Sequence, residues 1–405
     1  MTDSVPSTSR RLAVFVGSVF AAESAFFAVV PPLIPQLVRD VHLTTTEVGI
    51  LVAAYPAGVL LAAIPSMALV DRRGVRIATV VGVAVLIAST LGFGWGTSPL
   101  LLDVSRFVQG VGGAIAWAGA LAWLTSTTPS TRRGSVIGGA VGAALIGMVV
   151  GPPIGALASQ IGRGPVFSAL AIVLLLLLLA GPASAPASTP RHGSVQALIM
   201  LLRSRRAALG NGLLLVIGIV GGTLWSLVPL LVAHRNGGAG VIAAILAVSY
   251  TLAALMNVFL GRISDRFGRL LPTLVGLAIA AAMLPAIPFL GPLYALFIIS
   301  VAAQSVISAL WTPTAAMVSD GAEGSAAGQA VGVATMNAAW AAGGATGPIL
   351  AAWLADAAGF PLPFALAGAL CAASAVVMLV AYRRREEPKS TADTAPAIEQ
   401  RWPPS

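Results

Sequence analysis

Two charged residues lie inside long apolar runs of this sequence. Glu23 interrupts the run that follows Leu12, and Arg106 interrupts the run that follows Pro99. A charge near the centre of a bilayer is costly, so such residues usually face a cavity or a partner. Burial favours the neutral form of a carboxyl group, and a nearby cation favours the carboxylate. Glu23 could therefore hold a proton when Arg106 is distant and lose it when Arg106, or a cationic molecule, is near. The alternative is a structural ion pair.

The composition places these charges in lipid rather than in water. Of the 405 residues, 57% are hydrophobic and 9% are charged, against about a quarter charged in a typical soluble domain. This excludes a soluble enzyme, a disordered chain and a fibrous protein. The single cysteine, Cys371, excludes a disulfide framework and a cysteine metal cluster within one chain. All three histidines fall in expected loops, so we predict neither a bound metal nor an enzyme.

Charges, prolines and glycines divide the chain into twelve apolar segments, each near the ~20 residues that a membrane helix needs. They are 12–38, 46–70, 76–96, 99–125, 135–158, 165–182, 208–233, 239–261, 270–290, 292–318, 326–355 and 360–382. The segments are too long for barrel strands and show no period-two alternation. We therefore predict an all-α membrane protein with twelve transmembrane helices.

The basic residues give these spans an orientation. With the N-terminus in the cytoplasm, all but four of the 23 Lys and Arg residues fall on the inner side, the four being Arg39, Arg106, Arg163 and Arg235. The net charge of +9 then reflects topology, not nucleic-acid binding. We predict a multi-pass protein of the cell (inner) membrane with both termini in the cytoplasm.

The two halves of the chain resemble each other. Asp71-Arg72-x-Gly74 recurs 194 residues later as Asp265-Arg266-x-Gly268, and Gly147-x3-Gly151-Pro152 recurs 196 residues later as Gly343-x3-Gly347-Pro348. Such repeats predict two pseudo-symmetric six-helix bundles around a central cavity, related by an axis along the membrane normal. Residues 1–180 and 208–385 form the bundles, 181–207 a cytoplasmic linker, and 386–405 a disordered tail.

Several motifs resemble those of the major facilitator superfamily, and more narrowly its twelve-helix drug:proton antiporters. The resemblance covers nearly the whole chain. The second-half loop matches the superfamily signature at every fixed position, at Gly261, Asp265, Arg266, Gly268 and Arg269. The first-half copy keeps Asp71, Arg72, Gly74 and Arg76 but has Met67 and Val75 at two signature positions. The antiporter motif is matched at Gly147, Gly151, Pro152 and Gly155, and a further motif at Arg106-x-x-Gln109-Gly110-x-Gly112.

The resemblance implies roles for these motifs. Asp71 and Asp265 would form a latch that pairs across the halves in one state and releases in the other; the alternative is a solvated basic loop. Gly147, Gly151 and Gly155 are spaced four apart and form one bare helix stripe that permits close helix packing. The resemblance implies that this stripe seals the cavity in exporters, although close packing of small residues is also common in membranes.

The coupling residues are expected in the first half. At 1.5 Å per residue, Glu23 and Arg106 come to about the same depth in the membrane. Asp103, three residues before Arg106, is a rival partner, and Gln109 lies on the same helix face. The corresponding second-half positions are the apolar Ile217 and Val301. Neutral polar and aromatic residues are candidates for lining a cavity, namely Tyr55, Trp225, Tyr250, Asn257, Gln304, Trp311, Asn337 and Trp340.

The sequence as a whole predicts a secondary active transporter that works by alternating access. Proton-coupled antiport exporting hydrophobic or cationic small molecules is the first hypothesis, with the proton gradient in place of any cofactor. A facilitator or exporter of a polar metabolite, such as a sugar, nucleoside or organic anion, is the second, and a non-transporting membrane sensor is the third. We expect a small-molecule substrate, the lipid bilayer as environment, no nucleic-acid partner, and a functional monomer.

Overall fold

The structure is a computed structural model and describes all residues except 1–6, 130–131, 183–200, 202, 323–325 and 387–405. Most of the predicted linker and all but one residue of the predicted tail lie outside the described residues. Helices make up the first half: α1 (Ser7–Ala28), the 3-10 turn η1 (Pro31–Leu33), α2 (Ile34–Val41), α3 (Thr45–Arg73), α4 (Val75–Trp95), α5 (Pro99–Thr127), α6 (Arg133–Ile161) and α7 (Arg163–Ala180).

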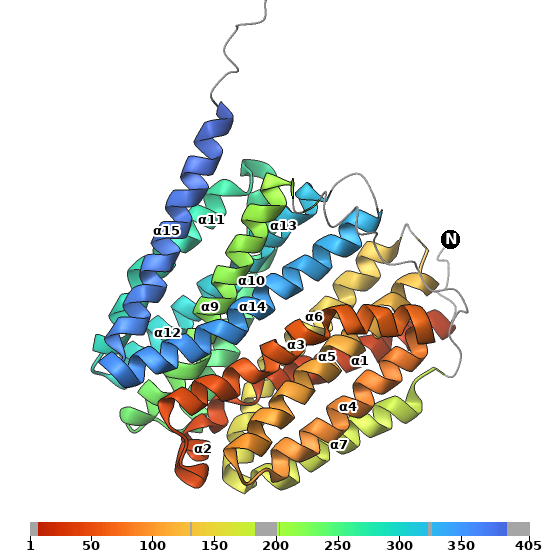
Figure 1. The fold of residues 1–405 in the computed structure, drawn as a ribbon, viewed down its shortest axis with the longest axis horizontal. Coiled ribbons are helices and arrows are strands. Elements are labelled where there is room, and N and C mark those ends of the chain that lie inside the picture. The colour runs from red at the N-terminus through yellow and green to blue at the C-terminus, as the bar shows by residue number, and fades with distance from the viewer. Residues whose placement is uncertain (1–6, 130–131, 183–200, 202, 323–325, 387–405) are drawn as a thin grey trace, which may run out of the picture.

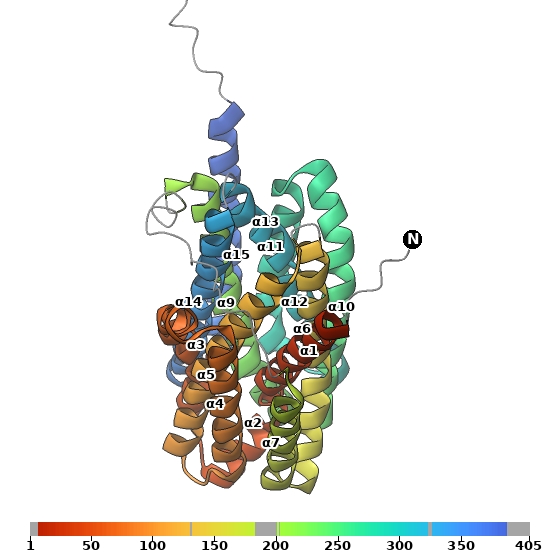
Figure 2. The ribbon, with the colours of Figure 1, turned by 90° about the vertical axis from the view of Figure 1, so that its right-hand side faces the viewer.

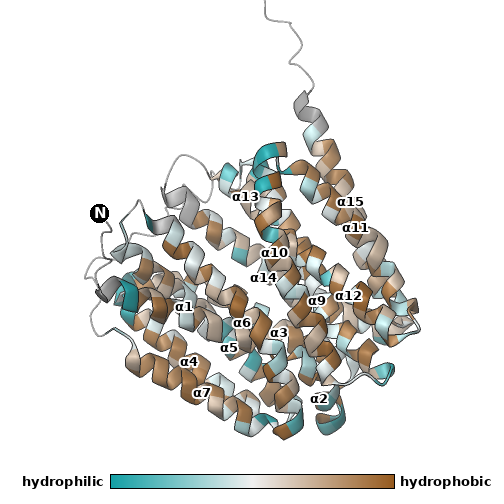
Figure 3. Cartoon of the chain, turned by 180° about the vertical axis from the view of Figure 1, so that it is seen from behind, coloured by the Kyte–Doolittle hydropathy of each residue, from teal (hydrophilic) through white to brown (hydrophobic). Residues whose placement is uncertain are grey.

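The second half is also helical. It contains α9 (Arg205–His234), α10 (Ala239–Phe267), α11 (Leu270–Met283), η3 (Leu284–Phe289), α12 (Leu293–Ala309), α13 (Trp311–Gly321), α14 (Ala326–Ala358) and α15 (Pro361–Glu386). Eleven segments of the described chain are long and apolar enough to cross a membrane. The helix α14, with 33 residues, covers the remaining predicted span. The predicted all-α architecture is therefore confirmed. Figure 3 shows the hydrophobic colour along the helices and the hydrophilic colour mainly near their ends.

Prolines interrupt three predicted spans that the sequence presents as continuous. The first is broken by η1, which begins at Pro31, after which α2 continues to Val41. In the ninth, α11 passes into the 3-10 turn η3 at Leu284, just before Pro285. The tenth is broken at Leu310 between α12 and α13. Proline lacks an N–H donor, and its ring clashes with the carbonyl four residues earlier. Pro313 stands four residues after Ala309, the last residue of α12, which accounts for the break in the tenth span.

The two halves share a packing scheme. Within the first half, α1 packs on α6 and α5 packs on α3 and α4; within the second, α9 packs on α14 and α10 on α12. The halves meet where α3 contacts α14 and where α6 contacts α10. In Figure 1 the halves converge near α2 and diverge toward the opposite ends of their helices. Figure 2 shows α3 beside α14 from a second direction.

Glycines allow the closest of these contacts. In the first half, a side chain at Gly147 or Gly151 of α6 would collide with the backbone of α1 at Ala21 or Ala25. Gly155 meets the backbone of Val29, the residue that directly follows α1. The predicted bare stripe therefore packs against the helix that carries Glu23.

The same contact recurs in the second half. A side chain at Gly343 or Gly347 of α14 would collide with the backbone of α9 at Leu215 or Ile219. Leu215 and Ile219 lie 194 residues after Ala21 and Ala25, and this is the offset of the sequence repeat. The repeat read from the sequence is thus also a repeat of helix packing.

Candidate functional site

Glu23 lies in the interior of the first half, with 4% of its surface exposed. Its Oε1 accepts a hydrogen bond from the hydroxyl of Tyr55 in α3. Its Oε2 accepts one from Nε1 of Trp117 in α5 at 2.8 Å and one from Oγ of Ser24 at 3.4 Å. Three helices therefore supply donors to one carboxyl group.

Small and aromatic neighbours fix this arrangement. A Cβ atom at Gly113 of α5 would lie 2.9 Å from Oε1 of Glu23 and 3.1 Å from the Tyr55 hydroxyl, so glycine leaves the room that both groups occupy. The indole of Trp117 stacks on the ring of Phe20, with centroids 3.7 Å apart and planes 7° from parallel. This stacking orients the N–H that reaches Glu23.

Arg106 is equally buried, with 2% of its surface exposed. Its guanidinium donates to the carbonyl of Phe26 at 3.2 Å and to the side-chain oxygen of Gln109. Its Cζ lies 5.0 Å from the centroid of the Tyr55 ring, a distance typical of a cation–π contact. Tyr55 thus stands between the two charges, with its hydroxyl on Glu23 and its ring face toward Arg106.

Neither candidate acid pairs with Arg106 in this state. Glu23, Asp103 and Arg106 are all described, and the structure contains no ion pair among these three. Asp103 is half-buried on α5. Gln109 supports Arg106 and donates weakly to Thr90 at 3.5 Å.

An aromatic cluster joins the two halves next to this site. Phe27 lies at its centre, with ring centroids 4.9 Å from Tyr55, 4.8 Å from Trp225 and 5.8 Å from Trp340. The rings of Trp225 and Trp340 are 6.3 Å apart. Since α1 and α3 supply two rings and α9 and α14 the other two, the cluster ties the Glu23 site to the second half.

Two small cavities border the aromatic cluster. The first is lined by Pro31, Leu224, Trp225, Val228, Pro229, Ile242, Ile245, Leu246, Ser300 and Gln304. The second is lined by Phe27, Ala28, Val30, Pro31, Val52, Arg106, Trp225 and Tyr250. Both therefore lie between the halves.

Three of the predicted lining residues, Trp225, Tyr250 and Gln304, line these cavities, and Tyr55 and Trp340 belong to the adjoining cluster. The other three line neither one. Asn257 accepts a hydrogen bond from Thr312 at 2.7 Å, Trp311 is half-buried at the start of α13, and Asn337 is exposed.

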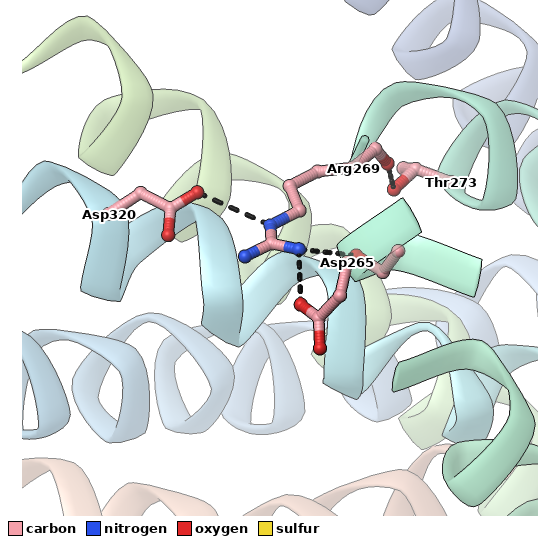
Figure 4. A network of polar contacts seen from close by, with 5 residues as sticks. Asp265, Arg269, Thr273 and Asp320 are labelled. Atoms are coloured by element: carbon pink, nitrogen blue, oxygen red, sulfur yellow. Dashed lines mark hydrogen bonds and ion pairs between the residues drawn. The ribbon is translucent and has the colours of Figure 1, made fainter. Parts of the chain in front are cut away.

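The second-half signature loop forms a charged network, shown in Figure 4. Arg269 bonds to Asp265 at 2.6 Å and to Asp320 of α13 at 3.3 Å. The hydrogen bond that Arg269 donates to Asp265 raises the pKa of Arg269, which keeps the guanidinium charged. These three residues belong to one half, so their contacts hold α10 to α13. Pairing of Asp265 across the halves stays a prediction for another state.

The backbone conformation of both loops favours glycine. Gly74 follows α3 with φ +86°, and Gly268 follows α10 with φ +83°, a region that other residues rarely adopt. Gly261 has open space where a Cβ would stand. Asp71, Arg72 and Arg76 are exposed. Arg266 places its guanidinium 5.3 Å from the ring centroid of Phe267. We call the end of the helices that carries these loops the basic end.

At the opposite end, a polar contact joins the two halves. Asp356, near the end of α14, accepts hydrogen bonds from the backbone N–H of Thr46 at 2.9 Å and from its hydroxyl at 2.6 Å. Thr46 lies in the first turn of α3, where backbone N–H groups lack helical partners. Gly49 lies about one turn further along α3, and a Cβ atom there would lie 2.5 Å from the backbone oxygen of Pro348. We call the Thr46–Asp356 contact the clasp.

Some residues of this site and of the clasp give little signal in the sequence. Trp117 follows Arg106 by eleven residues, or about three helical turns, so the two share one face of α5. That spacing was the available signal. Thr46 and Asp356 are 310 positions apart, and no motif connects them. Phe27 carries no polar group to distinguish it from the surrounding apolar run.

A two-fold repeated helical fold with a buried carboxylate inside its first bundle is typical of a membrane transport protein. The family model described as Major Facilitator Superfamily matches residues 15–232 and 211–404. The chain therefore belongs to the Major Facilitator Superfamily.

Its relatives include transporters of several kinds. "Multidrug resistance protein 1" of Bacillus subtilis is 30% identical over 36% of this chain and 38% of its own length. The human "Synaptic vesicular amine transporter" is 27% identical over 66% of this chain and 53% of its own. The chain thus matches less than two thirds of either relative. A bacterial homologue of the human lysosomal transporter Spinster, solved in an inward-facing and unoccupied conformation, shares the fold, with a TM-score of 0.79, 15% identity, and coverage of 94% and 98% of the two chains.

Proposed function

We propose that this protein is a proton-coupled antiporter that exports hydrophobic small molecules. The observation that carries the proposal is the Glu23 carboxyl group, buried inside the spanning helices and surrounded by donors from α1, α3 and α5. An ionisable group at such a place marks an ion or substrate pathway in most membrane proteins. The similarity to a multidrug resistance protein over about a third of the chain favours export.

The geometry supports a definite proton position. The indole N–H of Trp117 can only donate, so it holds Oε2 of Glu23 as an acceptor. A proton therefore binds Oε1, where the Tyr55 hydroxyl must turn from donor to acceptor. Because the Tyr55 ring contacts both Arg106 and Phe27, this reversal alters the aromatic cluster between the halves. Proton binding would thereby reach the interface that moves during transport.

The topology belongs to the same proposal. Arginines crowd the basic end, which we place in the cytoplasm of a cell whose inner membrane holds the protein, with both termini on that side. The clasp then closes the outer end, and the described state opens inward. One chain contains both bundles and the whole site, so we propose a functional monomer.

Exchange of Glu23 for Gln tests the proposal. A susceptibility screen of a strain lacking and then overproducing the protein first identifies a transported compound. Proteoliposomes loaded with a pH-sensitive dye then report proton movement when that compound is added. We expect wild type to show compound-dependent proton flux and Glu23→Gln to show none, because the amide cannot exchange a proton.

Glu47→Gln provides a matched acid-to-amide control. Glu47 caps the start of α3 in a capping box with Thr44, away from the carboxyl site. It should retain proton flux. Full gradient-driven transport by Glu23→Gln would refute the role of Glu23. Transport by wild type without any proton flux would instead favour a facilitator of a metabolite.

A further inference from the structure

Three buried hydrogen-bond donors beside the cavities have no partner among the described residues. They are Nε1 of Trp225, Oγ of Ser300 and Nε of Arg106. The three residues are 7%, 1% and 2% exposed, respectively. Buried polar groups in native proteins are nearly always hydrogen-bonded. Three unmatched donors at one place therefore indicate a ligand that supplies acceptors.

Ser300 shows that this is not a general property of the helix. Ser305, also on α12, donates to the carbonyl of Val301 at 2.7 Å, and Ser249 of α10 donates to the carbonyl of Ile245 at 2.5 Å. Both follow the common bond of a helical serine to the residue four positions earlier. The hydroxyl of Ser300 makes no such bond and lines the first cavity.

The donors line two neighbouring cavities that share Pro31 and Trp225. Trp225 lines both cavities, Ser300 lines the first and Arg106 the second. The indole N–H of Trp225 interacts only weakly with the nearby hydroxyl of Tyr250, in a geometry that does not complete a hydrogen bond. Indole and guanidinium N–H groups can only donate. With Phe27 and the Trp225 ring as walls, this space is apolar and rich in donors.

No carboxylate faces that space. The lining residues of both cavities include no Asp or Glu. Glu23 lies behind Tyr55 and Trp117, whose donors already bind its oxygens. A lipophilic cation would find an aromatic cage but no anion, and would bring no acceptor to the three donors.

We propose that the substrate is an uncharged apolar molecule whose acceptor oxygens bind Trp225, Ser300 and Arg106, while Glu23 binds only the proton. This rests on the proposed function and deepens it by naming the substrate class. The proton site and the substrate site are then separate, and Tyr55 and Phe27 connect them. It also departs from the cationic substrates that the sequence left open.

Two probes of similar shape and opposite chemistry test the proposal. Triphenylphosphine oxide is uncharged and carries one strong acceptor oxygen, whereas tetraphenylphosphonium is a cation without an acceptor. Each is titrated into purified protein in lipid nanodiscs and followed by quenching of tryptophan fluorescence. We expect the phosphine oxide to bind roughly fivefold more tightly, as one or two added hydrogen bonds provide.

Variants assign the effect to the named groups. Ser300→Ala should weaken phosphine oxide binding roughly threefold and leave phosphonium binding unchanged. Ser305→Ala, which removes a buried hydroxyl already bonded to the backbone, should change neither. Trp225→Phe removes the indole donor and should also weaken phosphine oxide binding. Because this variant loses a fluorescent residue, its binding is followed by ligand-induced shifts in thermal unfolding.

Each result decides the question. Tighter binding of the cation, binding of neither probe, or equal loss in Ser300→Ala and Ser305→Ala would overturn the proposed substrate site. Glu23→Gln should lose proton flux and still bind the phosphine oxide more tightly than the phosphonium, because the three donors are unchanged. Loss of probe binding in Glu23→Gln overturns the separation of the two sites. Retained proton flux in Glu23→Gln instead overturns the proposed function and leaves the binding result standing.

Discussion

The two halves of this protein share their packing but not their chemistry. The glycines at 147 and 151 press α6 onto α1, and those at 343 and 347 press α14 onto α9 in the same way. The charges have no such counterparts, since Ile217 and Val301 stand where Glu23 and Arg106 stand in the first half. The glycine contacts are thus needed to build each bundle, whereas the buried charges serve a task that one half performs alone.

Enlarging the packing glycines should produce the largest effect. Gly151→Val and Gly347→Val each place branched carbons against a neighbouring backbone, at Ala25 and Ile219. Overpacking of this kind costs ~1–3 kcal/mol or more. We expect both variants to unfold at clearly lower temperature in detergent, by similar amounts.

Gly142→Val is the matched control, because Gly142 of α6 has open space where a side chain would stand. It should leave thermal unfolding nearly unchanged. Loss of transport in Gly151→Val with an unchanged unfolding temperature would contradict the packing role and make the stripe a functional element of the first half alone.

A pair of tyrosines sharpens the chemical difference between the halves. Tyr250 follows Tyr55 by 195 residues and faces the second cavity. Tyr55→Phe removes the hydroxyl that binds Glu23, so we expect roughly tenfold slower proton-coupled transport, the scale of one hydrogen bond to a charged group. Tyr250→Phe should leave the ratio of protons to transported molecules unchanged. Proteoliposome assays that measure both fluxes check this, and a changed ratio in Tyr250→Phe would contradict an uneven division of labour.

The sequence predicts those features of the fold that depend on residues close together in the chain. Hydrophobic runs of about 20 residues reveal each helix, and the repeated glycines reveal the duplication, because both signals are local. The breaks at Pro31, Leu284 and Leu310 were missed, since prolines are common in spanning helices and their effect depends on neighbouring packing.

The site shows the same division. Glu23 and Arg106 stand out because charge is rare in apolar runs. Their partners do not, because Tyr55 and Trp117 meet Glu23 only after three helices have packed. The clasp is further from prediction still, since it joins residues at the two ends of the chain through a backbone N–H that exists in every sequence.

Weakening the clasp tests how the halves are held together. Asp356→Asn removes the negative charge that binds the first turn of α3, a contact to a helix N-terminus worth ~0.3–1 kcal/mol or more. We expect up to roughly a fivefold shift away from the described state, since 1 kcal/mol changes an equilibrium about fivefold. Spin labels at positions 72 and 266, both exposed, report the separation of the halves at the basic end, and this distance should shorten.

The spin labels should react with the introduced cysteines and not with Cys371, because Cys371 is fully buried. Asp40→Asn, which removes an exposed acid of α2, should leave the distance distribution unchanged. A distribution for Asp356→Asn that matches wild type would show that apolar contact between α3 and α14 holds the halves without the clasp.

The smallest effect on stability is expected at the signature loops. Asp265 is 76% exposed where it bonds to Arg269, and exposed ion pairs contribute ~0–1 kcal/mol. Asp265→Asn should therefore barely change thermal unfolding.

If Asp265 pairs across the halves in the opposite state, Asp265→Asn removes a contact that only that state makes. The population must then move toward the described state. Asp71→Asn should move it less, because Met67 and Val75 leave the first-half loop incomplete. Labels at the clasp end, at positions 39 and 236, both exposed, measure this shift. Equal populations of the two states in wild type and Asp265→Asn would show that Asp265 forms no contact across the halves. The basic loop would then serve only to orient the chain in the membrane.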